Sequence, residues 1–442
     1  MSGDVRKAVE MKSLPKERNT VTEVEANVSG ASRPSALKIT DMRVAYLKGA
    51  PFRSWLIRID TNQGISGYGE VRDGGSRTYA LLLKSRILGE NPCDVDRIFR
   101  RIVQFGHHAR QGGGVCAVEM ALMDLAGKAY GVPAYQLAGG KFRDRILCYC
   151  DTTSSPNGSE MGRRLKARMA DGFGFLKMDV GIGLLREETD CVIAPPGMLG
   201  TNSVMHPFTG IQLTEKGIGK LCEYVAAVRD SVGYEVPLAV DHFGHIGLES
   251  CIRLGKALDQ FSLAWYEDLI PWQFADQYER LSKAVDTPVC TGEDIYLKEG
   301  FAELFERRAI AVCHPDLATS GGILETKKIG DAAQEAGIAM AMHMAMSPVA
   351  AMASVHCAAA TENFMVLENH SVDDLERWSR LVEGLPVPLV EDGHIQVPET
   401  PGLGFSGLNE EVVAEFADPE QGEPFGPTDE WDGDLAHDRL WS

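Results

Sequence analysis

The sequence predicts an α/β protein built around a (β/α)7β TIM-like barrel, with an α+β capping domain formed by the N-terminal region and the C-terminal tail. The main observation is a series of short apolar runs that each end in an acidic residue or a histidine, 23 to 27 residues apart. Such an interval holds one strand, one loop and one helix, and polar residues at the carboxyl ends of barrel strands form the active sites of these folds. The residues concerned are Asp241, Glu267, Glu293, Asp316, His343 and Glu368.

Eight apolar segments are expected to form the strands of the barrel. Their nearly continuous apolarity is typical of parallel strands that are covered on both faces. An open doubly wound sheet is the alternative, but the even spacing and the lack of a G-x-G-x-x-G turn after the first strand favour a closed barrel. The expected strands are residues 146–151, 173–179, 236–241, 263–267, 288–293, 310–316, 338–343 and 364–368. Helical patterns fill most gaps, at residues 248–258, 275–283, 300–307 and 323–336.

The rest of the chain is assigned to a leader, a cap and a returning tail. Residues 1–35 are polar and charged, without the apolar segment of a signal peptide, and are expected to be a disordered leader. Residues 36–145 combine alternating strands with helical segments and form the α+β cap. Residues 146–370 form the catalytic barrel, and residues 371–442 return to the cap and end in an acidic tail.

Composition narrows the classes of partner. The formal net charge of −19 argues against nucleic acid and against membranes as partners. A small anionic molecule is still compatible with this charge, because a bound cation reverses the local sign. The ten cysteines include no CxxC pair, which indicates reduced thiols and a cytoplasmic location.

Three carboxylates follow neighbouring strands of the expected barrel. Asp241, Glu267 and Glu293 offer hard oxygen ligands, with no cysteine or histidine at equivalent steps. That ligand set favours Mg²⁺, or Mn²⁺, over zinc. Carboxylates that merely cap the following helices are the alternative, which explains one such residue better than three in succession.

Two further pairs of polar residues are candidates for catalysis. Asp316 and His343 end successive strands, and a carboxylate beside an imidazole gives a general acid or base near neutral pH. Lys177 and Asp179 point to the same side of the second strand and are expected to face the metal cluster from across the barrel. Lys177 could bind a carboxylate or act as a base, and Asp179 could act as a base or pair with Lys177.

One interval is longer than the others. Asp179 and Asp241 are 62 residues apart, and the excess lies near residues 187–216. Long loops above a barrel are commonly functional lids, so His206 in this insert is a candidate for contact with substrate. Arg72, in a loop of the cap, is interpreted as a surface residue.

The combined motifs resemble the mandelate racemase/muconate lactonizing branch of the enolase superfamily. Besides the Lys-x-Asp pair and the six strand-end residues, two segments carry the resemblance. Residues 118–140 read VEMALMDLAGKAYGVPAYQLAGG, similar to the first-domain signature of that branch. Residues 401–413 read PGLGFSGLNEEVV, similar to its C-terminal capping segment, so the resemblance covers residues 36–417.

The resemblance implies abstraction of the proton α to the carboxylate of a small-molecule substrate, with Mg²⁺ bound by the three strand-end carboxylates. Lys177 would bind the substrate carboxylate, and the Asp316–His343 pair would act as acid or base. Glu368 would contact the substrate and stabilise the enediolate. The resemblance also implies a homo-oligomer.

One departure favours a particular reaction. Members of the branch commonly have Lys-x-Lys on the second strand, where this chain has Asp179. We therefore expect dehydration of a sugar acid to a 2-keto-3-deoxy acid, with His343 or a neighbouring residue protonating the leaving hydroxide. In some sugar-acid dehydratases of the superfamily, a histidine just after the third-strand aspartate is the base, which makes His245 or His242 a candidate. A racemase, epimerase or cycloisomerase, and a non-catalytic binding protein, are the alternatives.

Overall fold

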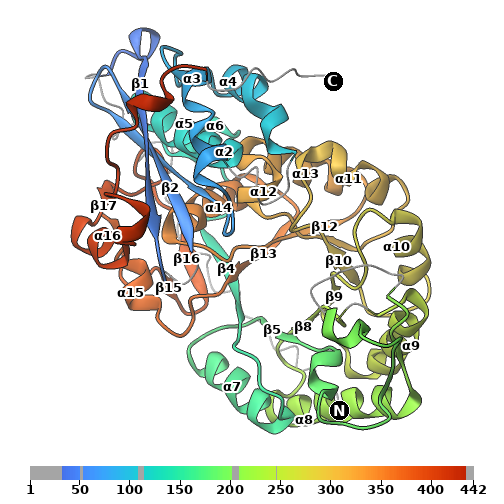
Figure 1. The fold of residues 1–442 in the computed structure, drawn as a ribbon. Helices are drawn as coiled ribbons and strands as arrows, with labels where there is room; N and C mark the ends of the chain where they lie inside the picture. Colours follow the sequence, from blue (N-terminus) through green and yellow to red (C-terminus); the bar gives the residue numbers. More distant parts are fainter. Residues whose placement is uncertain (1–31, 50–52, 108–113, 202–208, 245, 435–442) are drawn as a thin grey trace, which may run out of the picture.

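Figure 1 shows the fold in a computed structural model, which describes residues 32–49, 53–107, 114–201, 209–244 and 246–434. A small N-terminal sheet and its helices lie beside a larger barrel, and the C-terminal segment returns to the N-terminal sheet. Within these ranges, no helix combines the length and the apolar character that a membrane crossing requires.

A closed ring of parallel strands forms the barrel, which confirms the predicted fold class. In the described part of the chain, neighbouring strands follow the order of the sequence, and the last strand pairs with the first. The strands are β4 (Arg145–Asp151), β5 (Leu176–Asp179), β8 (Leu238–Asp241), β9 (Tyr266–Glu267), β10 (Val289–Thr291), β11 (Val312–Cys313), β12 (Ala339–Met342) and β13 (Phe364–Asn369).

Two of these strands end earlier than expected. Glu293 and Asp316 were assigned to the ends of strands, but β10 and β11 stop before both residues. Gly292 has a φ of 148°, which the side chains of other residues disfavour, so the backbone turns out of β10 just before Glu293. Asp316 follows β11 by three residues but still forms a parallel bridge with His343.

Helices cover the outside of the barrel (Figure 1). After β13 the chain enters the C-terminal segment instead of another barrel helix of similar length, as the (β/α)7β prediction requires. The helices are α7 (Gly158–Ala170), α8 (Glu215–Val232), α9 (Leu248–Leu258), α10 (Ala275–Ser282), α11 (Leu297–Glu306), α12 (Leu317–Ser320), α13 (Gly322–Glu335) and α14 (Pro348–Ala360). The long insert between β5 and α8 contains an antiparallel pair, β6 (Val192–Ile193) and β7 (Gln212–Leu213).

The cap is an antiparallel meander packed against α5 (Gly114–Tyr130). Gly67 and Gly69 on β3 allow this packing, because a Cβ would lie 2.3 Å from the carbonyl oxygen of Ala121 or 1.9 Å from that of Ala117. The other elements of the cap are β1 (Ile39–Leu47), β2 (Ser54–Thr61), β3 (Ser66–Val71), α2 (Arg77–Leu81), α3 (Lys84–Ile87), α4 (Val95–Ile102) and α6 (Ala134–Leu137).

The C-terminal segment fastens the cap to the barrel. In Figure 1 its red elements lie beside the blue strands of the cap, where Lys48 N–H donates to the Phe416 carbonyl at 2.7 Å. At its other end, β16 pairs antiparallel with the first barrel strand, β4. Its elements are α15 (Leu375–Ser379), β14 (Val382–Glu383), β15 (Val390–Glu391), β16 (His394–Gln396), β17 (Gly407–Leu408) and α16 (Glu410–Phe416).

One side chain from each strand region fills the interior of the barrel. These side chains form a separate buried apolar cluster, which closes the barrel beneath its carboxyl-terminal mouth. The cluster consists of Tyr149, Phe175, Ala239, Trp265, Cys290, Val312, Ala341 and Val366.

A buried histidine gives the fold a defined response to acid. The His356 ring on α14 stacks on Tyr135 at 5.6 Å, and its Nδ1 accepts the Tyr135 N–H at 3.2 Å. Burial lowers the pKa of His356 from its ordinary value of 6.5 to about 4. Since the unfolded chain takes up this proton first, stability is present above pH 6.5 and is lost as the pH falls toward 4.

We therefore expect His356→Gln to weaken the dependence of stability on pH. Between pH 6.5 and 5, the wild type should lose about 2 kcal/mol more of its free energy of unfolding than the variant does. Urea unfolding at both pH values measures this difference. The matched control is His394→Gln, in a partly exposed histidine of β16, which should behave as the wild type does. Equal slopes for His356→Gln and the wild type would contradict the assignment.

Candidate active site

A polar layer lies directly above the apolar cluster of the barrel. Side chains two positions apart on a strand point to the same side, so the residue two positions after each apolar side chain also faces the interior. Charged or imidazole groups occupy this position at seven of the eight strands, and Gly292 occupies the other. The seven residues are Asp151, Lys177, Asp241, Glu267, His314, His343 and Glu368.

Carboxylates of neighbouring strands converge on one side of this layer. Oxygens of Glu267, Asp268 and Glu293 all lie within 4.8 Å of one another. Asp241 Oδ2 and Glu267 Oε1 lie 3.0 and 3.3 Å from the same ammonium group, that of Lys177. Burial, together with the charge of Glu267, raises the pKa of Asp241.

Asp268 joins this cluster although the sequence analysis did not select it. Its φ of 47° lies in the left-handed region, which aspartate tolerates better than most residues do. Its Oδ1 accepts the Thr291 hydroxyl at 2.5 Å. Burial and the charge of Glu293 raise its pKa well above the usual range. The sequence signal that could have identified Asp268 is its position directly after Glu267.

The donor chemistry of the cluster fits a hard divalent cation. Asp241, Glu267 and Glu293, with Asp268 beside them, present carboxylate oxygens and no nitrogen or sulfur, as Mg²⁺ and Mn²⁺ prefer. Burial and neighbouring carboxylates raise the pKa values of Asp241 and Asp268, and a bound cation would favour their ionised forms.

Lys177 lies against the carboxylates, which corrects the expected position across the barrel from them. Besides Asp241 and Glu267, its Nζ contacts Glu368 Oε1 at 2.6 Å. Although burial favours the neutral amine, these charges raise the pKa of Lys177 well above its usual value. The closed ring places the second strand beside the third, so its long side chain reaches the acids directly.

The predicted Asp316–His343 pair is formed. His343 Nδ1 lies 2.6 Å from Asp316 Oδ2, and its Nε2 lies 3.0 Å from Glu293 Oε2. Asp316 also accepts the Ala318 N–H at 2.7 Å, which fixes its orientation. Burial opposes ionisation of Asp316, but the charges of Arg72 and His343 lower its pKa. One imidazole nitrogen is thus held by a carboxylate, while the other faces Glu293 of the carboxylate cluster.

Arg72 is buried at this site, and its interpretation as a surface residue is wrong. Its Nη1 donates to the Glu293 carbonyl and to the Thr319 hydroxyl, both at 2.7 Å, and lies 3.4 Å from Asp316 Oδ2. The end of β3 carries the guanidinium from the cap onto the barrel mouth. Nothing in the local sequence shows that this cap loop meets the barrel.

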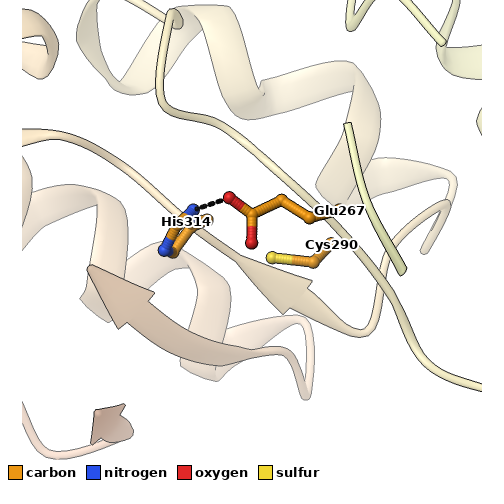
Figure 2. A group of neighbouring side chains, drawn as sticks. All are labelled: Glu267, Cys290 and His314. Atoms are coloured by element: carbon orange, nitrogen blue, oxygen red, sulfur yellow. Dashed lines mark ion pairs between the residues drawn. The ribbon is translucent and has the colours of Figure 1, made fainter. Parts of the chain in front are cut away.

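His314 is a further buried residue that the sequence analysis missed. Figure 2 shows its ring beside Glu267 and Cys290, with Nδ1 3.1 Å from Glu267 Oε1. Its Nε2 lies 2.8 Å from the Tyr149 hydroxyl. Burial favours the neutral imidazole, but the charge of Glu267 raises the pKa of His314. Burial also raises the pKa of the Cys290 thiol, so we interpret this trio as a support for Glu267.

Glu368 lies between two imidazoles at the far side of the layer. Its Oε1 is 2.9 Å from Nε2 of His370, while its buried Oε2 makes no hydrogen bond with any described residue. Oε2 lies 3.7 Å from Nε2 of both His314 and His343. Burial opposes ionisation, but the charges of Lys177, His343 and His370 lower the pKa of Glu368 well below its usual range.

The candidate bases have different positions. Asp179 is half-buried and pairs in register with Asp241 across β5 and β8, and no ion pair joins it to Lys177 among the described residues. His242 is exposed, and its backbone N–H donates to Asp241 Oδ1 at 2.8 Å. His206 and His245 lie outside the described residues.

Two family descriptions match the chain. Residues 160–412 match the enolase C-terminal domain-like family, and residues 34–139 match the mandelate racemase/muconate lactonizing enzyme N-terminal domain. Among solved structures, a mandelate racemase/muconate lactonizing enzyme-like protein from Rubrobacter xylanophilus superposes with a TM-score of 0.77 at 29% identity, covering 88% of this chain and 99% of that one.

Curated relatives extend over most of the chain. D-xylonate dehydratase of Haloferax volcanii is 33% identical over 409 residues, which cover 90% of this chain and 92% of that protein. D-galactonate dehydratase of Ralstonia pickettii is 25% identical over 391 residues, which cover 86% of this chain and 94% of that protein.

A metal-binding measurement tests the carboxylate cluster. Glu267→Gln should weaken Mg²⁺ binding by at least about 100-fold, since even the loss of a residue that only orients a ligand costs 10- to 100-fold in affinity. We expect Asp268→Asn to weaken it as well, because an oxygen of Asp268 lies within 4.8 Å of those of Glu267 and Glu293. Calorimetric titration with Mg²⁺ measures both, and Glu306→Gln on the exposed face of α11 is the matched control. Unchanged affinity in Glu267→Gln would refute this metal site.

Proposed function

Because the chain belongs to the mandelate racemase/muconate lactonizing branch of the enolase superfamily, we propose that it is a hydro-lyase that dehydrates a sugar acid to a 2-keto-3-deoxy acid. The names of the curated relatives support this reaction, since both are dehydratases of sugar acids. The observation that carries the proposal is the contact of His343 Nε2 with Glu293 Oε2 at 3.0 Å, which puts a proton-transfer group beside a metal-binding carboxylate.

The α-proton of a carboxylate is a weak acid, so its removal requires positive charge near the substrate carboxylate. Asp241, Glu267 and Glu293 would hold Mg²⁺, which when bound supplies that charge as a Lewis acid. Lys177 supplies positive charge from the protein itself. Its raised pKa and its three carboxylate partners favour a permanently charged ammonium over a base.

His343 is the proposed acid for the leaving group. Asp316 holds Nδ1, so Nε2 is the atom that delivers a proton. A base takes the proton from C2, the C3–O bond breaks, and the hydroxide leaves as water with the proton from Nε2. The resulting enol gains a proton at C3 and loses its hydroxyl proton, which gives the 2-keto-3-deoxy acid and leaves no net change in protons.

The proposed base lies at the ends of β5 and β8, on the side away from His343. Asp179 ends β5 and is half-buried, and His242 directly follows β8; His245, three residues further along the sequence, is also a candidate. This arrangement suits a dehydration. One group on one side of the substrate takes the proton from C2, and a different group on the other side protonates the leaving hydroxide.

A substrate screen tests the reaction. We expect the enzyme with Mg²⁺ to convert at least one aldonic acid, D-xylonate and D-galactonate included, to a product that semicarbazide detects, and EDTA to abolish the conversion. His343→Asn should lower kcat by about 10² to 10⁴-fold. Solvent deuterium at C2 without a keto product would indicate a racemase or epimerase instead. Neither exchange nor product across the acids would favour a binding protein.

Proton exchange can identify the base separately. In D₂O, the variant that lacks the base should lose wash-out of the C2 proton by about 10²-fold or more, while His343→Asn should retain it. Asp179→Asn, His242→Gln and His245→Gln are compared by mass spectrometry of recovered substrate. Normal exchange in all three variants would place the base elsewhere.

A further inference from the structure

A second imidazole–carboxylate pair lies beside Glu368 and has no role in the reaction as proposed. His370 Nε2 is 2.9 Å from Glu368 Oε1, and its Nδ1 is 3.3 Å from Asp151 Oδ2. Asp151 ends β4 and Glu368 lies on β13, the two strands that close the barrel. The first and last barrel strands thus assemble a pair that mirrors Asp316–His343.

We infer that His370, held by Asp151, is a positioning residue that acts through Glu368 by lending it a proton when the substrate becomes an enediolate. The inference rests on the proposed function, because the proton is needed only if negative charge develops on substrate oxygens. It adds a role for two residues and leaves the base and the leaving-group acid as they are.

The state of Glu368 creates the need for this proton. A carboxylate repels an enediolate, and a proton on Glu368 removes that repulsion. Without substrate, Lys177 at 2.6 Å and two histidines keep Glu368 ionised. Its buried Oε2 makes no hydrogen bond with the described residues, so this oxygen is available to a ligand.

Among the groups around Glu368, His370 is the best placed to provide the proton. Lys177 is shared among three acids, and burial raises the pKa of Tyr149. The Nε2 atoms of His314 and His343 lie 3.7 Å from Glu368, beyond hydrogen-bonding distance. His370 is within that distance, and its side chain is 20% exposed against 0% and 7% for the other two histidines, so it can exchange protons with water.

The proton balance of this step is closed. The N–H bond at Nε2 of His370 breaks and an O–H bond forms on Glu368, which converts imidazolium and carboxylate into imidazole and carboxylic acid. Asp151 stabilises the imidazolium before the transfer and orients the ring through Nδ1. When the enol becomes the keto acid, the proton returns to Nε2, so nothing is consumed.

The test compares two variants of the full-length enzyme with Mg²⁺, on whichever sugar acid the wild type converts. His370→Gln keeps an N–H that can donate to Glu368 but cannot transfer a proton. We expect kcat to fall by about 10²-fold or more, with KM changed less than about threefold, because Lys177 still binds the carboxylate. A role in packing alone predicts that glutamine restores kcat.

Asp151→Asn gives an independent readout. His370 must begin protonated, so wild-type kcat should fall as the pH rises through the pKa of His370. Burial favours its neutral form, but Glu368 and Asp151 raise this pKa. Without the charge of Asp151 the alkaline limb of kcat should move to lower pH, while turnover persists below it.

The outcomes separate the two hypotheses. A wild type that dehydrates no sugar acid refutes the proposed function. An active wild type with normal kcat in His370→Gln, or with an unmoved alkaline limb in Asp151→Asn, refutes this inference alone. Thermal unfolding and Mg²⁺ affinity check each variant, and if His370→Gln does not fold, the pH profile of Asp151→Asn decides. His394→Gln is the matched histidine control and should match the wild type.

Discussion

Repulsion among closely spaced carboxylates is the constraint on which the rest of the site depends. Oxygens of Glu267, Asp268 and Glu293 share a space within 4.8 Å, with Asp241 and Glu368 joined to them through Lys177. Glu267 and Glu368 are buried and the other three are half-buried, so each negative charge is costly unless a cation or a proton compensates it. Burial and neighbouring acids raise the pKa values of Asp241 and Asp268, whereas, against the effect of burial, His314 and Lys177 lower that of Glu267. A divalent cation would relieve the remaining repulsion.

The same constraint explains how the protein cations are distributed. Lys177 contacts three acids at once, and Arg72 descends from the cap to Glu293 and Asp316. Through Arg72 the cap contributes positive charge beside Glu293 and Asp316, in addition to covering the mouth of the barrel. The C-terminal segment then matters to the site because it ties the cap sheet to the first barrel strand.

Two imidazole–carboxylate pairs lie beside Glu368 in this charged layer. Asp316–His343 and Asp151–His370 flank Glu368, while the candidate base Asp179 lies at the end of β5. The neutral and charged forms of an imidazole differ by one proton, so the histidine of each pair can gain or lose a proton when charge develops on the substrate.

The sequence by itself determined the barrel, the cap and most of the polar layer, because strand alternation and the βα interval are local properties of the chain. Asp151 and His314 were not selected from the sequence; the structure places each two positions after a side chain of the buried apolar cluster. Only the tertiary structure decided that Lys177 contacts the acids, that Arg72 is buried and that Asp268 turns toward Glu293. The contacts of Lys177 depend on closure of the barrel, and those of Arg72 depend on how the cap packs against the barrel. The position of Asp268 depends on its left-handed backbone conformation.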